Sequence, residues 1–513
     1  MNLPRWLTAN LLSGALVLLA YPPLNVYWLG FVCFAPHLVF LAQESHPKRL
    51  ALGVWLFQSI LLVGRGYYFF EPIFYCANLL LVAGLIPVTL MAQAFMARVR
   101  QRSARVCGLV AVIAGCYLGF EWFQAQFSFL PLVAGASGAS LGHSPFVGLA
   151  RFGGLRGLSL FVVMINAICA WGWLASHQDK TKRAGGRISQ KLLAAGGLNG
   201  AVLGAGLLLS QHVVVQQRAA YLKKPHAVTI AAVSVSRQFA KDTQFFWDSD
   251  TSQALIDVVS RDVGSLKEAL HQHPGKPDLI IFPEDMIDIE FWGRSDPQAR
   301  ERFTITNAGP LIALYRTVSQ ELHASLLFVL TTLEQAGRFN SALLLDPSGS
   351  LVTVSHKRDL AIALEYWPFG RFHPWYIDWR MDEEARVESP IYNPAYQYLP
   401  GDSIGLFHLT QGATFGAPIC IEIHYPDHVR AAGRQGAQFL SNTSSNMSME
   451  YGLRTYLELT LNLRRIEAVW LHLPIIFCGR RDYAGMVFPD GHADFLGLDE
   501  TEPFRIYYGS VRF

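Results

Sequence analysis

Three side chains that could together carry out acyl transfer stand directly after apolar runs in the second half of this 513-residue chain. "DLIIFPE" ends in Glu284, "SLVTVSHK" ends in Lys357, and "FGAPIC" ends in Cys420. In layered α/β folds, active sites collect at strand ends, where side chains converge from separate loops. A carboxylate can take the thiol proton, the thiolate can attack a carbonyl carbon, and an ammonium can stabilise the oxyanion. The three residues therefore indicate chemistry through a thioester.

Each of these residues also has an ordinary structural interpretation. A Glu after a strand is commonly solvated, a Lys there commonly faces water, and a Cys in a strand commonly belongs to the core. Cys420 and Cys478 are the two cysteines of this half, so they could instead form a disulfide in an oxidising compartment. A zinc site is disfavoured, because there is no C-x-x-C or H-E-x-x-H pattern and His424 alone accompanies Cys420. Spacing alone does not decide whether Cys420 is a nucleophile, a core thiol or half of a disulfide.

The second half of the chain alternates between strand and helix patterns. Such elements are needed to bring Glu284, Lys357 and Cys420 together. Residues 227–236 read as a strand and 252–273 as an amphipathic helix. Further helices are expected near 309–323, 426–436 and 450–470. The strand preceding the thiol is expected to end at Cys420 itself. Strands alternating with helices predict an α/β layered fold.

The first half of the chain consists of long apolar stretches separated by short basic loops. The chain is 51% apolar with a mean hydropathy of +0.25, which is high for a soluble protein. Seven membrane spans are predicted, near 5–21, 25–42, 49–69, 72–96, 104–126, 146–175 and 191–211. The sixth is overlong and could begin with an interfacial segment. Lys and Arg gather in alternate loops, which predicts a cytoplasmic N-terminus and a second half on the far side of the membrane.

Short motifs around the three residues resemble a known superfamily. "FPED", "HKRDLAIALEYWP" and "ICIEI" resemble the Glu, Lys and Cys motifs of the nitrilase, or carbon–nitrogen hydrolase, superfamily. Combined with the multi-span first half, the whole chain resembles the apolipoprotein N-acyltransferase family. The family's second glutamate, eight residues after its lysine, corresponds to Glu365. The glutamate after its nucleophile corresponds to Glu422, whereas Ile421 replaces an aromatic residue.

The resemblance implies a multi-pass α-helical membrane domain over residues 1–215 and a nitrilase-like α-β-β-α sandwich domain over 216–513. It implies that Cys420, activated by Glu284, takes an acyl chain from a phospholipid and passes it to the N-terminal amine of a diacylated lipoprotein. Lys357 would help form the oxyanion hole, and Glu365 and Glu422 would support the site. The implied setting is the bacterial inner membrane, with the catalytic domain periplasmic. We expect a monomer with no cofactor and no metal. No nucleic-acid partner is expected either, because the net charge is only +3.

Several further positions bear on the substrate. Trp247 and Trp367, the latter in the aromatic stretch 366–379, are expected to line a lip at the lipid interface, and Asn442 to lie in a substrate loop. The family's aromatic pair after the nucleophile is missing from "SNTSSNMSM" (441–449), "GRRDY" (479–483) carries unexpected charge, and no final membrane helix follows "IYYGSVRF". These departures predict either a different donor or acceptor, or unchanged activity with altered loops. A membrane-tethered amidase or hydrolase is the competing enzyme class, and a non-catalytic scaffold is the competing class without catalysis.

Overall fold

The computed structural model describes residues 4–66, 115, 118–119, 121, 137–180, 190–239, 252–284, 310–334, 336–362, 364–370, 391–446, 449 and 452–513. The chain divides into two compact units. The first, the helical unit, contains Met1–Val215 together with Met449–Trp470, and the second, the sheet unit, contains Gln216–Ser448 together with Leu471–Phe513. The long helix expected near 450–470 is α14 (Leu453–Leu471), and it belongs to the helical unit.

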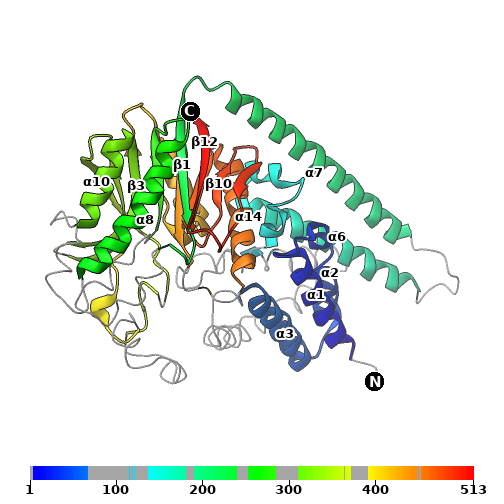
Figure 1. The fold of residues 1–513 in the computed structure, drawn as a ribbon. Helices are drawn as coiled ribbons and strands as arrows, with labels where there is room; N and C mark the ends of the chain where they lie inside the picture. Colours follow the sequence, from blue (N-terminus) through cyan, green and yellow to red (C-terminus); the bar gives the residue numbers. More distant parts are fainter. Residues whose placement is uncertain are drawn as a thin grey trace. The chain divides into compact units, whose positions relative to one another are not determined.

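Most of the predicted spans that fall on described residues are helices. They are α1 (Arg5–Ala20), α3 (Pro47–Gly66), α6 (Gly154–Lys180) and α7 (Gln190–Leu222) (Figure 1). A short 3-10 helix, η4 (Val147–Phe152), precedes α6, so the overlong sixth stretch does begin with a separate segment. The stretches 72–96 and 104–126 lie outside the described residues, apart from 115, 118, 119 and 121. Within the described chain, Gly154–Ser176 and Leu192–Leu222 are long and apolar enough to cross a membrane.

The second predicted span, 25–42, is wrong as a single helix. The chain instead forms η1 (Tyr27–Phe31) and, after a break, α2 (Ala35–Gln43). The break is stabilised by a polar side chain from α6, because the backbone N–H groups of Phe34 and Ala35 donate to Asn166 Oδ1 over 2.8 and 3.1 Å. Helix N-termini leave such N–H groups without intrahelical partners. Apolar composition alone could not reveal a break whose cap lies far along the chain.

The sheet unit is built around one sheet with the strand order β5-β4-β3-β2-β1-β9-β8-β7-β6. These strands are β1 (Ala227–Val235), β2 (Leu279–Glu284), β3 (Ser325–Glu334), β4 (Gly337–Leu345), β5 (Leu351–His356), β6 (Leu406–His408), β7 (Thr414–Gly416), β8 (Phe439–Ser445) and β9 (Ile475–Arg480). β1, β2 and β3 are parallel, as are β7, β8 and β9, whereas β3, β4 and β5 are antiparallel. Three further strands, β10 (Ala484–Val487), β11 (Ala493–Leu496) and β12 (Phe504–Arg512), join it, with β12 antiparallel to β1 (Figure 1).

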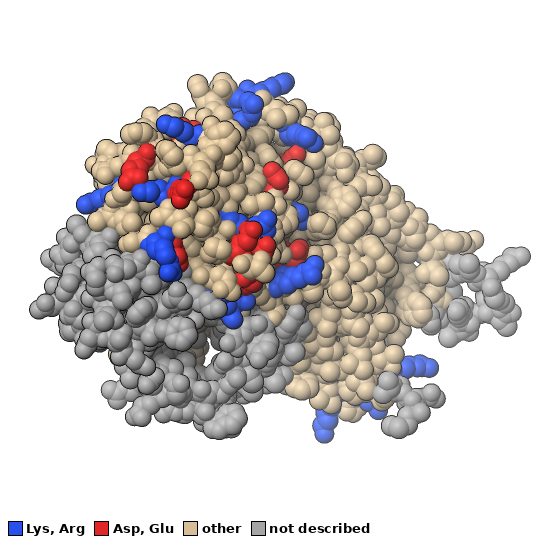
Figure 2. All heavy atoms as spheres, viewed as in Figure 1, with Lys and Arg blue, Asp and Glu red and all other residues tan. Residues whose placement is uncertain are grey.

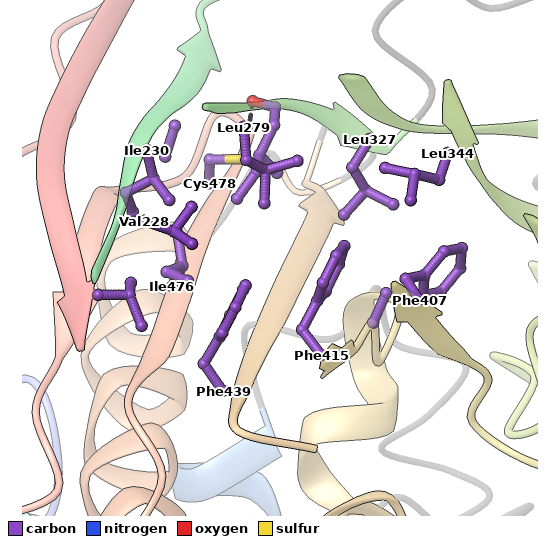
Figure 3. Packing of buried hydrophobic residues seen from close by; sticks show 14 of the residues in the cluster. Val228, Ile230, Leu279, Leu327, Leu344, Phe407, Phe415, Phe439, Ile476 and Cys478 are labelled. Carbon is purple, nitrogen blue, oxygen red and sulfur yellow. Dashed lines mark hydrogen bonds between the residues drawn. The ribbon is translucent and has the colours of Figure 1, made fainter. Parts of the chain in front are cut away.

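Alternation along the strands creates two apolar layers. On β2, Ile280 and Phe282 face a cluster that also contains residues of α8 (Ser252–Gln272) and α10 (Pro310–Leu322). Leu279 and Ile281 face the opposite way, into a second cluster shared by strands from both halves of the sheet. In Figure 3 a row of phenylalanine rings from that cluster faces a row of leucines across it: Phe407, Phe415 and Phe439 against Leu279, Leu327 and Leu344. The sheet unit is therefore a layered α/β sandwich.

The strand before the thiol ends earlier than the sequence predicts. β7 ends at Gly416, and only a single bridge, Ile419 to Thr443, continues the pairing. Pro418 explains the difference, because proline has no N–H to donate to a sheet ladder. Cys420 instead begins the 3-10 helix η9 (Cys420–His424), and its φ is +51°. Behind it, α13 (Pro426–Arg434) packs against β7, where Gly416 makes room for Ala432.

Candidate active site

Two carboxylates converge on one buried ammonium at the carboxyl ends of the strands. Glu284 is the last residue of β2, and Lys357 directly follows β5. Lys357 Nζ donates to Oε1 of Glu284 over 3.1 Å and to Oε1 of Glu365 over 2.9 Å. The side chain of Lys357 is only 1% exposed, so these bonds lie away from water. Ala361 N donates to the other oxygen of Glu365, which fixes that carboxylate on its own loop.

The ammonium of Lys357 is held in its charged form. Burial by itself would lower the pKa of Lys357, but Glu284 and Glu365 outweigh this and raise it well above its ordinary value. A buried cation without such partners would lose its proton instead. One positive charge thus faces two carboxylates, and the site is able to stabilise negative charge without titrating near neutral pH.

Asn340 is a member of this cluster that sequence reasoning missed. It lies on β4, and its Nδ2 donates to Glu284 Oε1 over 2.8 Å and to Glu365 Oε1 over 2.6 Å. Its side chain is buried, with 4% of the residue exposed. The available signal was a lone amide inside the apolar strand pattern "FNSALLL". An amide there needs partners, because a buried polar group without hydrogen bonds is costly.

Cys420 stands at a sharp turn of the backbone next to this cluster. Its positive φ is uncommon for a residue with a Cβ, and such strained positions concentrate at functional sites. Asn442 stabilises the turn, since its Nδ2 donates to the carbonyl oxygens of Pro418 and Cys420 over 3.0 and 3.1 Å. Burial and the nearby carboxylate of Glu284 raise the pKa of the Cys420 thiol, while Lys357 acts in the opposite direction. The thiol is therefore protonated at rest and needs a base.

Glu422 connects the cysteine turn to the lysine segment. Its Oε2 accepts from Ile419 N over 2.6 Å, and its Oε1 accepts from Arg358 N and Asp359 N over 2.7 and 3.2 Å. Burial raises the pKa of Glu422 to about 7, Asp359 adds to this, and the N–H donors oppose it. The carboxylate of Glu422 thus holds the residue before Cys420 and the residue after Lys357 at fixed positions.

The remaining predicted site residues are less closely connected to the cluster. Ile421 is buried at 4% exposure. The Trp367 ring lies edge-on to that of Phe369, with 5.0 Å between centroids, and Phe369 is 47% exposed. Trp247 lies outside the described residues, as do residues 371–379 of the aromatic stretch.

The two cysteines of the sheet unit are not joined, so the disulfide interpretation is wrong. Both Cys420 and Cys478 are free thiols. Cys478 is fully buried in the second apolar cluster, the one that contains Leu279, with its Sγ 3.6 Å from the carbonyl oxygen of Ile281 (Figure 3). Over the described part of the chain, no group of three His, Cys, Asp or Glu side chains is arranged to hold a metal ion.

The arrangement can support acyl transfer through a thioester. Glu284 Oε1 is occupied by donors, whereas its Oε2 is buried and has no hydrogen-bond partner among the described residues. A carboxylate oxygen in that state can accept a proton from a thiol. The ammonium of Lys357 is able to stabilise an oxyanion, and the thiol of Cys420 is able to act as a nucleophile.

Two family models match successive parts of the chain. The apolipoprotein N-acyltransferase N-terminal domain matches residues 13–168, and the carbon-nitrogen hydrolase model matches residues 254–509. The apolipoprotein N-acyltransferase of Brucella melitensis is 24% identical over 473 residues, covering 85% of this chain and 77% of that protein. That of Geobacter metallireducens is 21% identical over 528 residues, covering 98% of this chain and 88% of that protein.

Among solved structures, this chain is similar to a carbon-nitrogen hydrolase from Helicobacter pylori G27. The two are 15% identical with a TM-score of 0.39, over 56% of this chain and 89% of the other. Both sequence relatives match this chain over most of its length, and so across both of these domains. The chain therefore belongs to the apolipoprotein N-acyltransferase family of the carbon–nitrogen hydrolase superfamily.

Proposed function

We propose that this protein is an enzyme that transfers an acyl chain from a membrane phospholipid to the N-terminal amine of a diacylglyceryl-cysteine in apolipoproteins. Glu284, Lys357 and Cys420 are the proposed catalytic residues, with Glu365 and Glu422 in support. One observation supports this chemistry above the others: Lys357 is buried between two carboxylates at a strained cysteine whose thiol requires a base. The family relationship supports the lipid substrates.

In the first step, Cys420 Sγ would attack the ester carbonyl carbon of a phospholipid while its proton passes to Glu284 Oε2. The S–C bond forms, and Lys357 Nζ stabilises the oxyanion of the tetrahedral intermediate. The ester C–O bond then breaks, and the proton passes from Glu284 to the departing lysophospholipid oxygen. The enzyme is left as an acyl thioester.

In the second step, the lipoprotein amine would attack the thioester carbonyl carbon. Glu284 takes a proton from the attacking nitrogen, the N–C bond forms and the C–S bond breaks. The sulfur recovers its proton from Glu284, so the enzyme returns to its starting state. In both acylation and deacylation, Glu284 first accepts a proton from the nucleophile and then gives it to the leaving group.

Both proposed substrates are lipids, so the proposal includes a membrane setting. The helical unit would be a multi-pass domain of about seven spans over residues 1–215, and the sheet unit would catalyse on the periplasmic side of the bacterial inner membrane. Two long apolar helices and the basic alternate loops support this. Figure 2 adds that charged side chains gather over β1, α8 and α10, while the described surface over α6 and α7 on that face carries few.

The segment 364–370 would form part of a lip at the lipid interface. Leu364 and Phe369 are 49% and 47% exposed and stand on either side of Glu365, which is buried. Trp367 lies between them in sequence and packs on Phe369. Exposed apolar side chains beside a catalytic cluster suit an approach to lipid, where aromatic residues also prefer to lie.

The intact mass of the detergent-solubilised protein tests this function. We expect incubation with phospholipid to add one fatty-acyl mass to the wild type, and a synthetic diacylated lipopeptide to remove it and become triacylated. Cys420→Ala should gain no mass. Cys478→Ala is the matched control, because it removes the other thiol of the same unit and should still be acylated.

Three other outcomes would contradict the proposed function. An adduct that water discharges as fast as the lipopeptide does would indicate a membrane-tethered hydrolase. An adduct of equal yield on Cys420→Ala would exclude Cys420 as the nucleophile. No adduct on any form with several phospholipid classes would exclude a phospholipid donor.

A further inference from the structure

Four polar atoms in the active site form a closed ring of alternating donors and acceptors. Lys357 Nζ and Asn340 Nδ2 are the donors, and the Oε1 atoms of Glu284 and Glu365 are the acceptors. Each donor bonds both acceptors, at distances from 2.6 to 3.1 Å. Asn340 is thus the neutral donor of the ring, and Lys357 is the charged donor across from it.

Strand pairing places the two donors on one side of the sheet. Ser341 on β4 pairs with His356 on β5, so Asn340 and Lys357 are the next residues across the antiparallel ladder. Lys357 N donates to Asn340 O over 2.7 Å, which continues that pairing past the end of β5. Side chains of directly opposite residues share one face and lie close together. The backbone pairing therefore places both donors on the same face of the sheet, independently of their side-chain hydrogen bonds.

The ring determines the orientation of the Asn340 amide. Its NH2 group has two hydrogens, and both are used on carboxylate oxygens. The flipped amide would instead set its oxygen against two negatively charged oxygens, which is repulsive. Asn340 is buried, so water cannot take over these bonds.

The ring also distinguishes the two oxygens of Glu284. Oε1 accepts from both Asn340 and Lys357, whereas Oε2 is buried and no described residue donates to it. Hydrogen bonds to a carboxylate favour its ionised form. With two donors already bound to Oε1, Oε2 is the oxygen left to receive a proton.

We propose that Asn340 is a positioning residue that holds Glu284 through its Oε1 and thereby assigns proton transfer to its Oε2. This rests on the proposed role of Glu284 as the base for Cys420. Asn340 contacts neither the reacting thiol nor a substrate in this assignment; it acts through Glu284. Loss of its two N–H donors would leave two carboxylates sharing one ammonium, so they would hold a proton up to higher pH and less free carboxylate would be available to take the thiol proton.

The test is the pH dependence of Cys420 alkylation by iodoacetamide, measured by mass spectrometry on the whole detergent-solubilised protein. This reaction reports deprotonation of the thiol and needs no lipid substrate. For Asn340→Ala we expect the rate at neutral pH to fall about 10- to 100-fold, as for the loss of hydrogen bonds to a charged group. We also expect the acidic limb of the profile to move to higher pH.

Asn340→Asp separates this role from packing. The variant keeps the side-chain volume but replaces the NH2 group, and with it both N–H donors, by one oxygen, so we expect a larger shift of the profile than for Asn340→Ala. Ser341→Ala is the matched control on the same strand, because Ser341 bonds His356 and Thr332 rather than the ring. Its profile should coincide with that of the wild type.

The buried thiol of Cys478 reports whether each variant is folded. If Cys478 becomes reactive in Asn340→Ala, Asn340→Ser takes its place in the comparison. An unshifted profile in folded Asn340 variants would overturn the proposal. Failure of the proposed function is distinguishable, because absence of a lipid adduct on the wild type leaves the alkylation profiles measurable.

Discussion

Lys357 Nζ lies 2.9 Å from Glu365 Oε1, and these two residues are eight positions apart on a loop that leaves β5. The bond is buried at both ends, with side-chain exposures of 1% and 10%. It extends the proposed catalytic pair Glu284–Lys357 to a cluster with two carboxylates for one cation.

Replacing Lys357 should abolish acylation and lower the stability of the fold. Lys357→Met would leave two buried carboxylates without their cation, and breaking a buried pair in this way costs about 3–5 kcal/mol. We expect no acyl adduct on the timescale of the wild type and a melting temperature lower by several degrees in detergent. Lys267→Met is the control: its bond to Glu321 is exposed, so it should cost less than about 1 kcal/mol. Equal losses for both variants would contradict this account.

Glu365→Gln should slow thioester formation without abolishing it. The neutral amide cannot accept from Asn340, Lys357 and Ala361 N at once, because one of its two polar atoms is a donor. We expect a decrease of about 10- to 100-fold in the rate of acylation, measured by intact mass in a single turnover. Glu334→Gln changes a carboxylate that is 43% exposed and bonds His356, and should leave the rate unchanged.

Glu422 should make the stability of the protein fall as pH rises from 5 to 7. Its pKa is about 7 in the folded state and has an ordinary value of 4.5, so the folded protein holds a proton that the unfolded chain has released in this interval. Stability decreases with pH wherever the folded state binds more protons, and this shift corresponds to about 3 kcal/mol. Above pH 7 the contribution is constant.

The measurement is the melting temperature of wild type and Glu422→Gln between pH 5 and 8. The variant has no ionisable group at this position, so its melting temperature should decline less between pH 5 and 7. Glu321→Gln, at an exposed carboxylate, should follow the wild type. A slope in Glu422→Gln as steep as that of the wild type would show that other groups cause the decline.

The backbone strain at Cys420 should be visible in two inactive variants. A left-handed φ costs a residue with a Cβ about 1–2 kcal/mol, and glycine avoids this cost. Cys420→Gly should therefore be at least as stable as Cys420→Ala, by up to about 1 kcal/mol, although glycine is normally the less stable of the two. Thermal unfolding compares them. A Gly variant clearly less stable than the Ala variant would mean that the turn is not strained.

The sequence by itself determined the strand–helix order of the sheet unit and the identity of the residues at its strand ends. β1, β2, α8 and α10 follow from local periodicity, because apolar alternation and amphipathic spacing depend only on neighbours in the chain. Motif spacing also indicated Glu365 and Glu422 through the family resemblance. These are local properties, and a single chain displays them directly.

Tertiary structure decided what depends on residues far apart in sequence. The break before α2 is stabilised by Asn166, more than a hundred positions away, and the end of β7 follows from a proline within an otherwise apolar run. Asn340 enters the site only because β4 pairs with β5 and the carboxylates arrive from elsewhere. A hydrogen-bonded ring has no periodicity along the chain, since its members are brought together by the sheet and not by their spacing.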